Sequence, residues 1–157
     1  SLGTAQMRVP SAYPVLATIM RAGLPFHHGF LNYFDHSDSA FVSAYRTLSK
    51  DKGDFIVDVE YFSCPDIDGR ELIVSDPMLA TGSSMVKVLE ALLKIGKPSH
   101  IHIATILATR EGINRVKRGA PSNTTIWTGA IDDELTAQAY IVPGLGDAGD
   151  LAFGKKS

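Results

Sequence analysis

Small polar residues gather in one loop of this 157-residue sequence, directly after an apolar run. The apolar residues Leu72 to Val74 are followed by Asp76 and Pro77, and the loop ends in Ala80-Thr-Gly-Ser-Ser84. An amphipathic run then begins at Met85, so the order is strand, loop, helix. The N-terminus of a helix presents unpaired backbone N–H groups and partial positive charge, and hydroxyl groups add further donors. The sequence therefore predicts a phosphate-binding loop with a carboxylate beside it.

Two further loops could bring polar groups to the same place. Arg21 directly follows Val15 to Met20, a continuous apolar run that is typical of a buried strand. A Gly-rich segment, Pro143 to Asp150, follows the apolar residues Tyr140-Ile-Val142. Because ligands bind at the carboxyl ends of strands in parallel α/β sheets, the three loops can lie on one rim. Arg21 would bind an anion there, and the glycines around Asp147 would let the backbone approach a ligand.

Plain structural explanations stay open for each of these groups. Arg21 could be a solvated arginine at the start of a helix, and Ala80 to Ser84 could be a simple capped turn. Asp147 could be a carboxylate at a loop tip. Arg46 also follows an apolar run, but arginines after edge strands are common, so its indication is weaker.

Other motifs do not indicate a site. Gly144-Leu-Gly-Asp-Ala-Gly149 matches the dinucleotide-binding pattern but lacks the strand–helix context and the downstream acid that this function requires. His27 and His28 face different sides of a helix, so we do not expect them to share a metal. His100 and His102 alternate along a strand without a third ligand, and we interpret them as structural.

Alternating strand and helix patterns predict an α/β domain with a mainly parallel central sheet flanked by helices. We expect strands at 15–20, 40–45, 55–62, 72–74, 101–107, 124–128 and 140–142. We expect helices from Pro25 onward, at 85–95 and at 110–119. Polar connections are expected at 47–54 and 132–138, and the segment 143–150 is expected to be a loop.

Composition narrows the function classes. Hydrophobic residues make up 45% of the sequence and charged residues 20%, which is ordinary for a globular protein. The net charge of −2, without a long Lys/Arg cluster, argues against a nucleic-acid partner. No apolar run is long enough to span a bilayer, and the single cysteine, Cys64, excludes an internal disulfide. Without a signal peptide, a cytoplasmic enzyme is the expectation.

Three segments resemble a known family when they are taken together. Asp76 to Ser84 resembles the phosphoribosyl-diphosphate loop of uracil phosphoribosyltransferases, and Tyr140 to Asp150 resembles their uracil-binding segment. Arg21-Ala-Gly-Leu24 is similar to their diphosphate loop, and Tyr45-Arg46 to the arginine of their mobile loop. The similarity runs over nearly the whole sequence in matching order.

The resemblance implies a type I phosphoribosyltransferase fold, with residues 1–157 as one domain that carries a small hood and a β-arm. It implies the conversion of uracil and 5-phospho-α-D-ribose 1-diphosphate into UMP and diphosphate, a reaction of pyrimidine salvage. It also implies Mg²⁺ without a direct protein ligand, a homodimer or larger homo-oligomer, and a possible GTP effector. A nucleic-acid or membrane partner is not expected.

Roles for individual residues follow from the same resemblance. Arg21 and Asp147 would be the catalytic residues. The phosphoribosyl diphosphate would contact Arg21, Arg46, Asp76, Pro77, Met78, Leu79, Ala80, Thr81, Gly82, Ser83, Ser84 and Asp147. The uracil would contact Ile141, Gly146, Asp147 and Ala148, mainly through their backbone.

Two features depart from the family pattern. The family loop usually has a second glycine where this sequence has Ser83. If that position needs a positive φ, serine would cost about 1 kcal/mol, and otherwise it adds a hydroxyl donor. The family also carries an N-terminal segment before the Leu2-Gly3 region, and this sequence lacks it. A non-catalytic nucleotide-sensing regulator on the same fold, or transfer to another base, is the alternative function.

Overall fold

The computed structural model describes residues 2–8, 12–48 and 55–155, and for residues 45–48 and 55–58 it describes the backbone only. Its elements, in chain order, are β1 (Val15–Met20), α1 (Leu24–Leu31), β2 (Ser39–Leu48), β3 (Phe55–Ser63), β4 (Glu71–Ser75), β5 (Met78–Leu79), α2 (Ser83–Leu92), β6 (His100–Ala108), α3 (Arg110–Gly119), β7 (Thr124–Ile131), β8 (Glu134–Leu135), β9 (Ile141–Val142) and α4 (Ala148–Phe153). No helix in these ranges is long and apolar enough to cross a membrane.

The central sheet has the strand order β3-β2-β1-β4-β6, and β6 also pairs with both β5 and β7. Every pair in it is parallel except β2–β3, which is antiparallel. The expected mainly parallel α/β sheet is therefore confirmed. Parallel strands align their carboxyl ends, so the segments after β1, β4 and β6 emerge at one edge.

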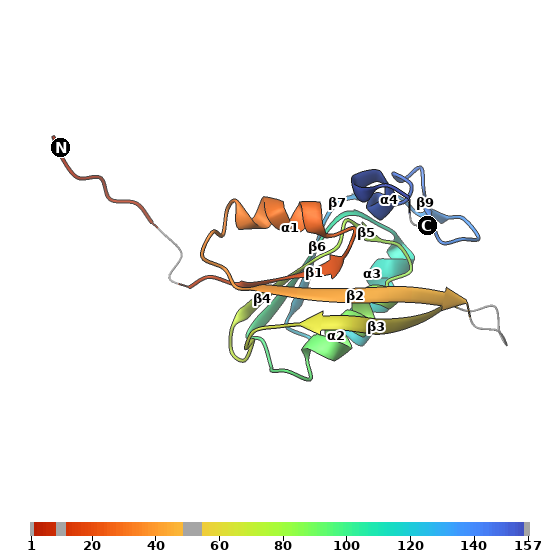
Figure 1. The fold of residues 1–157 in the computed structure, drawn as a ribbon, viewed down its shortest axis with the longest axis horizontal. Coiled ribbons are helices and arrows are strands. Elements are labelled where there is room, and N and C mark those ends of the chain that lie inside the picture. Colours follow the sequence, from red (N-terminus) through yellow and green to blue (C-terminus); the bar gives the residue numbers. More distant parts are fainter. Residues whose placement is uncertain (1, 9–11, 49–54, 156–157) are drawn as a thin grey trace.

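Helices cover both faces of this sheet (Figure 1). On one face, α2 buries Met85, Val88, Leu89 and Leu92 in a core that also contains Val116 of α3. On the other face, three phenylalanines and Leu31 pack against Leu16, Ile73 and Ala104; the phenylalanines are Phe26, Phe30 and Phe34. Alternate residues of β1 enter the two cores, because side chains point to opposite faces along a strand.

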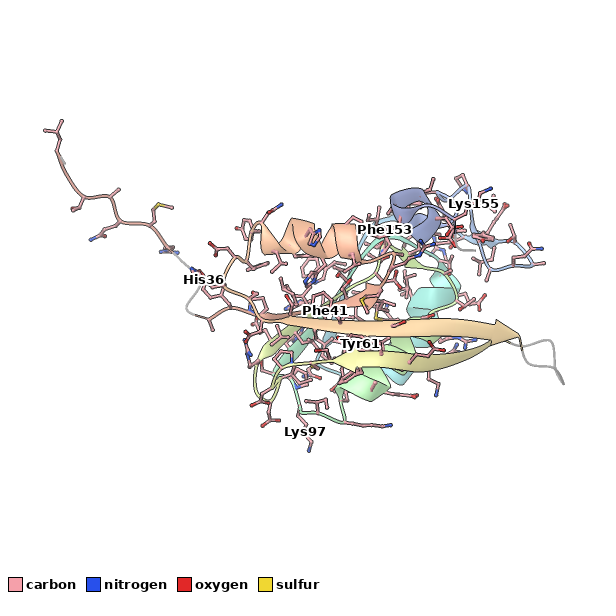
Figure 2. All side chains as sticks on the ribbon, viewed as in Figure 1. His36, Phe41, Tyr61, Lys97, Phe153 and Lys155 are labelled. Carbon is pink, nitrogen blue, oxygen red and sulfur yellow. The ribbon has the colours of Figure 1, made fainter. Side chains whose placement is uncertain are left out.

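Two parts extend from the core. The hairpin of β2 and β3 runs well beyond the other strands and forms the expected β-arm (Figure 1). The small antiparallel pair β8–β9 and helix α4 lie together beyond the sheet edge, where a hood was expected. Phe153 and Lys155 lie in the hood region, and His36 lies toward the N-terminal side of the molecule (Figure 2).

The predicted elements match the structure most closely at their centres. The predicted bounds 15–20 and 110–119 agree with β1 and α3, whereas β2 and β7 extend three residues beyond the expected ends. Helix α2 begins at Ser83 instead of Met85 and ends at Leu92 instead of Ile95. The predicted loop at 143–150 is wrong in part, because α4 begins at Ala148. Residues 49–54 of the predicted polar loop lie outside the described residues.

Core packing by α2 gives a first test. Leu89 is 1% exposed, so Leu89→Ala leaves a cavity and should lower the free energy of unfolding by about 3 kcal/mol. Lys87→Ala on the exposed side of the same helix is the matched control and should change it by less than about 0.5 kcal/mol. Urea unfolding followed by circular dichroism measures both; similar losses in the two variants would contradict this packing.

The buried side chain of His27 gives a second test, which concerns the dependence of stability on pH. Burial lowers the pKa of His27 below its ordinary value, and nearby His28 adds to this effect. The unfolded chain binds this proton near pH 6.5, so the stability due to neutral His27 is present above that pH and is lost as the pH falls below it. His102, whose pKa is lowered chiefly by burial, acts in the same direction.

We therefore expect the parent chain to lose more stability between pH 7.5 and pH 5.5 than His27→Asn does, as measured by urea unfolding at both values. The exposed neighbour supplies the control, and His28→Asn should lose nearly as much stability as the parent chain, because burial is the larger cause of the lowered pKa of His27. An equal loss in His27→Asn and the parent would show that His27 does not carry this dependence.

Candidate active site

The loop between β4 and α2 builds the predicted phosphate site. Gly82 lies in the left-handed region, with φ of 76°, and is the N-cap residue of α2. The chain reverses there, so the first turn of α2 points its N–H groups toward the sheet edge. A short strand, β5, interrupts the loop at Met78–Leu79 and pairs with β6. The predicted loop at 76–84 is therefore held to the sheet in its middle.

This loop is pressed against the first turn of α3. A Cβ atom on Gly82 would lie 2.7 Å from the carbonyl oxygen of Gly112, and one on Gly112 would lie 2.4 Å from that of Ala80. The buried hydroxyl of Thr109 donates to the Ala80 carbonyl at 2.7 Å and accepts from the Gly112 N–H at 2.9 Å. The two glycines and the Thr109 hydroxyl therefore hold the phosphate loop in a fixed position relative to α3 and the sheet.

Ser83 occupies the first helical position of α2. Among the described residues other than glycine, only Ala139 has a positive φ, so the strained alternative for Ser83 is wrong. Its hydroxyl instead accepts hydrogen bonds from Thr81 Oγ1 at 3.2 Å and from Arg115 Nη1 at 2.9 Å. The serine therefore adds a side-chain group to the loop without distorting it.

Arg21 stands at the carboxyl end of β1. Its Nη2 forms an ion pair with Asp150 Oδ1, and its Nη1 donates to the Gly154 carbonyl at 2.8 Å. Arg21 Nε is buried and has no acceptor among the described residues. Behind it the backbone turns tightly, because a Cβ on Gly23 would lie 2.2 Å from Thr18 Oγ1. A rigid loop thus holds a cation with one unused donor at the sheet edge.

The hood segment is shaped by its glycines and by two aspartates. A Cβ on Gly144 would lie 2.1 Å from the carbonyl oxygen of Ile141, and the Gly144 N–H donates to Asp132 Oδ2 at 3.1 Å. Asp147 Oδ1 accepts from the Asp150 N–H at 2.8 Å and caps α4. These contacts turn the chain back over the sheet edge and expose the backbone around Gly146.

A hydrogen bond at the base of the hood joins it to α3. Arg110 Nε donates to Asp133 Oδ2 at 2.7 Å. This hydrogen bond holds the pKa of the Asp133 carboxyl below its ordinary value. Because Asp133 is an exposed group, the ion pair orients the connection after β7 and adds little to stability.

A cleft of about 350 Å³ joins the three loops. The segment after β1 contributes Met20, Arg21 and Ala22, and the phosphate loop contributes Pro77, Met78, Ala80 and Ser84. The hood contributes Gln138, Ala139, Tyr140, Gly146, Asp147, Ala148 and Gly149. The volume lies within the range of small-molecule sites, and the cleft combines apolar walls, backbone amides, a cation and a carboxylate.

Comparison with known proteins shows to which family the chain belongs. A sequence model of uracil phosphoribosyltransferase matches residues 3–155. The chain belongs to the uracil phosphoribosyltransferase family. A uracil phosphoribosyltransferase of Porphyromonas gingivalis is 57% identical over 155 residues, covering 99% of this chain and 71% of that protein. One from Methanothermobacter thermautotrophicus is 40% identical over 144 residues, covering 91% of this chain and 64% of that protein.

Solved structures agree on the fold. The AQ2163 protein from Aquifex aeolicus superposes with a TM-score of 0.81 at 30% identity, over 89% of this chain and 64% of that one. A hypoxanthine phosphoribosyltransferase from Staphylococcus aureus superposes with a TM-score of 0.59 at 17% identity, over 80% of this chain and 65% of that one. The predicted type I phosphoribosyltransferase fold is therefore confirmed.

Within this phosphoribosyltransferase fold, most of the predicted site residues meet at the cleft. Eight of the fifteen line it: Arg21, Pro77, Met78, Ala80, Ser84, Gly146, Asp147 and Ala148. Thr81, Gly82 and Ser83 continue the same loop into α2, and half-buried Asp76 precedes it. The side chains of Leu79 and Ile141 are 1% and 2% exposed and belong to the interior. Arg46 pairs with Val57 in the β-arm, and its side chain lies outside the described residues.

Some residues of this candidate site were not predicted. Asp150 pairs with Arg21, and Thr109 with Gly112 supports the phosphate loop. Ala139 lines the cleft with φ of 62°, a backbone region that favours glycine. Thr109 had a usable signal, because a threonine directly before a helical pattern is a typical N-cap. The others depend on contacts between distant segments and had none.

The contact between the loop and α3 gives a third test. Gly82→Ala combines an unfavourable φ with a clash against Gly112, so the loop must move. We expect KM for phosphoribosyl diphosphate to rise more than tenfold, as measured by steady-state UMP formation. Gly29→Ala is the control, because nothing lies within 4 Å of a Cβ built there, and it should leave KM unchanged. Unchanged KM in Gly82→Ala would contradict this account of the loop.

Proposed function

We propose that this chain transfers the phosphoribosyl group of 5-phospho-α-D-ribose 1-diphosphate to uracil, giving UMP and diphosphate. The observation that carries the proposal is the cleft, which brings together Arg21, the phosphate loop and the Gly-rich hood segment at the carboxyl edge of the sheet. Membership of the family supports the same reaction. Salvage of uracil is the corresponding metabolic role.

The reaction forms a bond between a uracil nitrogen and C1 of the ribose and breaks the bond between C1 and the diphosphate oxygen. The proton of that uracil nitrogen passes to the departing diphosphate or to water. Positive charge builds on the ribose ring, and the departing diphosphate takes the electron pair. The protein must therefore hold both reactants in line and stabilise charge on the leaving group. No side-chain nucleophile is required for such a direct displacement.

The phosphate loop, Ala80 to Ser84, would hold the 5′-phosphate. Gly82 shapes the turn, the first turn of α2 supplies N–H groups, and Ser84 lines the cleft. Asp76, which precedes the loop, would accept hydrogen bonds from the ribose hydroxyls. Its carboxylate Oδ1 already accepts from the Met78 N–H at 3.3 Å, which orients it in the loop.

Arg21 would stabilise the leaving diphosphate. Arg21 lines the cleft, so its guanidinium would reach the diphosphate by exchanging its contacts with Asp150 and the Gly154 carbonyl. Arg46 of the β-arm would add a second cation. Asp147 would lie beside the ribose, where its negative charge favours the positive ring of the transition state.

The uracil would be read by backbone groups of the hood. Gly146 has φ of 79°, and nothing lies within 4 Å of a Cβ built on it, so the backbone there is open to a planar ring. Ala148 lines the cleft beside it, and the backbone of Ile141 would complete the contacts. Backbone donors and acceptors suit uracil, because its edge presents alternating carbonyl and N–H groups.

Mg²⁺ would be carried on the oxygens of the diphosphate and ribose. Within the described ranges, no three His, Cys, Asp or Glu side chains group as a metal cage. Mg²⁺ usually keeps several waters and binds proteins through few carboxylates together with substrate phosphates. When bound, the ion neutralises diphosphate charge. The assignment of no direct protein ligand stays a prediction.

Assembly and control rest on the resemblance. A homodimer or larger homo-oligomer, control by GTP, and a cytoplasmic setting stay predictions. The absence of nucleic-acid and membrane partners also stays a prediction.

Arg21→Ala and Asp147→Asn give the fourth test. Arg21→Ala removes the leaving-group cation, and we expect kcat/KM for UMP formation to fall at least a hundredfold. Asp147→Asn keeps an oxygen for the α4 cap but removes the charge, and we expect a fall of at least tenfold. Radiolabelled uracil measures both. Arg70→Ala is the control, since Arg70 pairs with Asp38 outside the cleft.

Near-normal turnover in both variants would remove these residues from the site. Preference for hypoxanthine over uracil in a competition assay would assign another base. Tight UMP binding without turnover in the parent chain would favour the nucleotide-sensing alternative.

A further inference from the structure

Ser83 is joined to a side chain of a different helix. Arg115 of α3 donates from Nη1 to Ser83 Oγ at 2.9 Å, across 32 residues of sequence. Thr81 Oγ1 donates to the same oxygen at 3.2 Å. Two donors thus occupy the lone pairs of the Ser83 hydroxyl, so its own hydrogen is left to donate elsewhere.

Arg115 lies directly against the phosphate loop. Its Cβ would be 3.3 Å from a Cβ built on Gly82, so the arginine stem rests on the loop where α2 begins. Within the described part of the chain, ion pairs engage Arg21, Arg70 and Arg110, but none engages Arg115. Among the described residues, no carboxylate oxygen lies within ion-pair distance of its guanidinium.

The charge of the expected ligand makes this arrangement useful. A 5′-phosphate carries close to two negative charges, whereas a helix N-terminus supplies only about half a positive charge. Arg21 is paired with Asp150 on the hood side of the cleft. Arg115 is the cation that the structure places at the loop itself.

We propose that Arg115 is a positioning residue for the 5′-phosphate: it turns the Ser83 hydroxyl toward the phosphate and adds positive charge beside it. The proposal rests on the proposed function, since it concerns the same phosphate. If Arg115 has this role, the affinity for the phosphate depends on α3, and Ser83, which replaces the second loop glycine of the family, connects the two.

The test uses ribose 5-phosphate, which carries the phosphate but no leaving group, and isothermal titration calorimetry on the full chain. Arg115→Ala should weaken binding five- to tenfold, and Ser83→Gly should weaken it by a similar factor. The double variant should bind no more than twofold more weakly than the weaker single variant, because the two side chains act through one contact. Arg115→Lys should recover part of the affinity, since it keeps the charge but loses the planar guanidinium.

Arg118→Ala is the matched control on the same helix, because Arg118 is also exposed and lies in the last turn of α3, whereas the phosphate loop contacts its first turn. It should bind ribose 5-phosphate like the parent chain. In turnover assays, Arg115→Ala should raise KM for phosphoribosyl diphosphate by more than it changes kcat, because the contact is made before and after the chemical step.

Two results would overturn the proposal. Equal affinities in Arg115→Ala and Arg118→Ala would show that Arg115 does not act on the phosphate. Additive losses in the double variant would exclude the route through Ser83. Both are measured without turnover, so an inactive parent chain would reject the proposed function and leave this result separate.

Discussion

The contact between the phosphate loop and the first turn of α3 is the constraint on which the rest of the site depends. Two glycines, Gly82 and Gly112, let the backbones approach so closely that a Cβ on either would clash. Thr109 then satisfies the polar groups that this contact buries. Because backbone contacts hold this loop, the position of the first residue of α2 relative to the sheet is fixed. The N-terminal amides of α2 therefore face the cleft.

On the opposite side of the cleft, an ion pair attaches the hood to the sheet. Arg21 ties the loop after β1 to Asp150 and to the Gly154 carbonyl, so the hood is attached to the sheet through one guanidinium. Charge pairs respond to ionic ligands, whereas close backbone contacts do not. The site therefore combines a wall held by backbone contacts, which in the proposed function faces the ribose phosphate, with a wall held by an ion pair, which would face the diphosphate.

Sequence patterns predicted the strands and helices whose apolar residues form a continuous run or a regular stripe. Strand β1 and helix α3 were found with their bounds, because a continuous apolar run and a helical stripe need no tertiary information. Strands β5 and β8 have two residues each, too few for any periodicity to appear. Helix α4 was missed because it has only six residues and follows a Gly-rich segment, so the N-cap signal of Asp147 was not followed by a recognisable helical stripe.

The site residues also divide into those that the sequence indicated and those that it did not. The residue types of the phosphate loop and Arg21 were visible, because chemistry at the end of a strand is marked locally. The partners of these residues were not: Asp150 meets Arg21 and Arg115 meets Ser83 only because the sheet is assembled. The question about Ser83 could be posed from sequence, yet only its helical backbone and its contact with α3 gave the answer.

The pairing of Arg21 with Asp150 spans 129 residues, which is most of the chain. A polypeptide is made from its N-terminus, so the cation exists long before the carboxylate that orients it. Long-range contacts of this kind form late, after the loops between them have closed. The ion pair between Arg21 and Asp150 can therefore form only after α4, the last helix of the described chain, has been made and has packed against the end of β1.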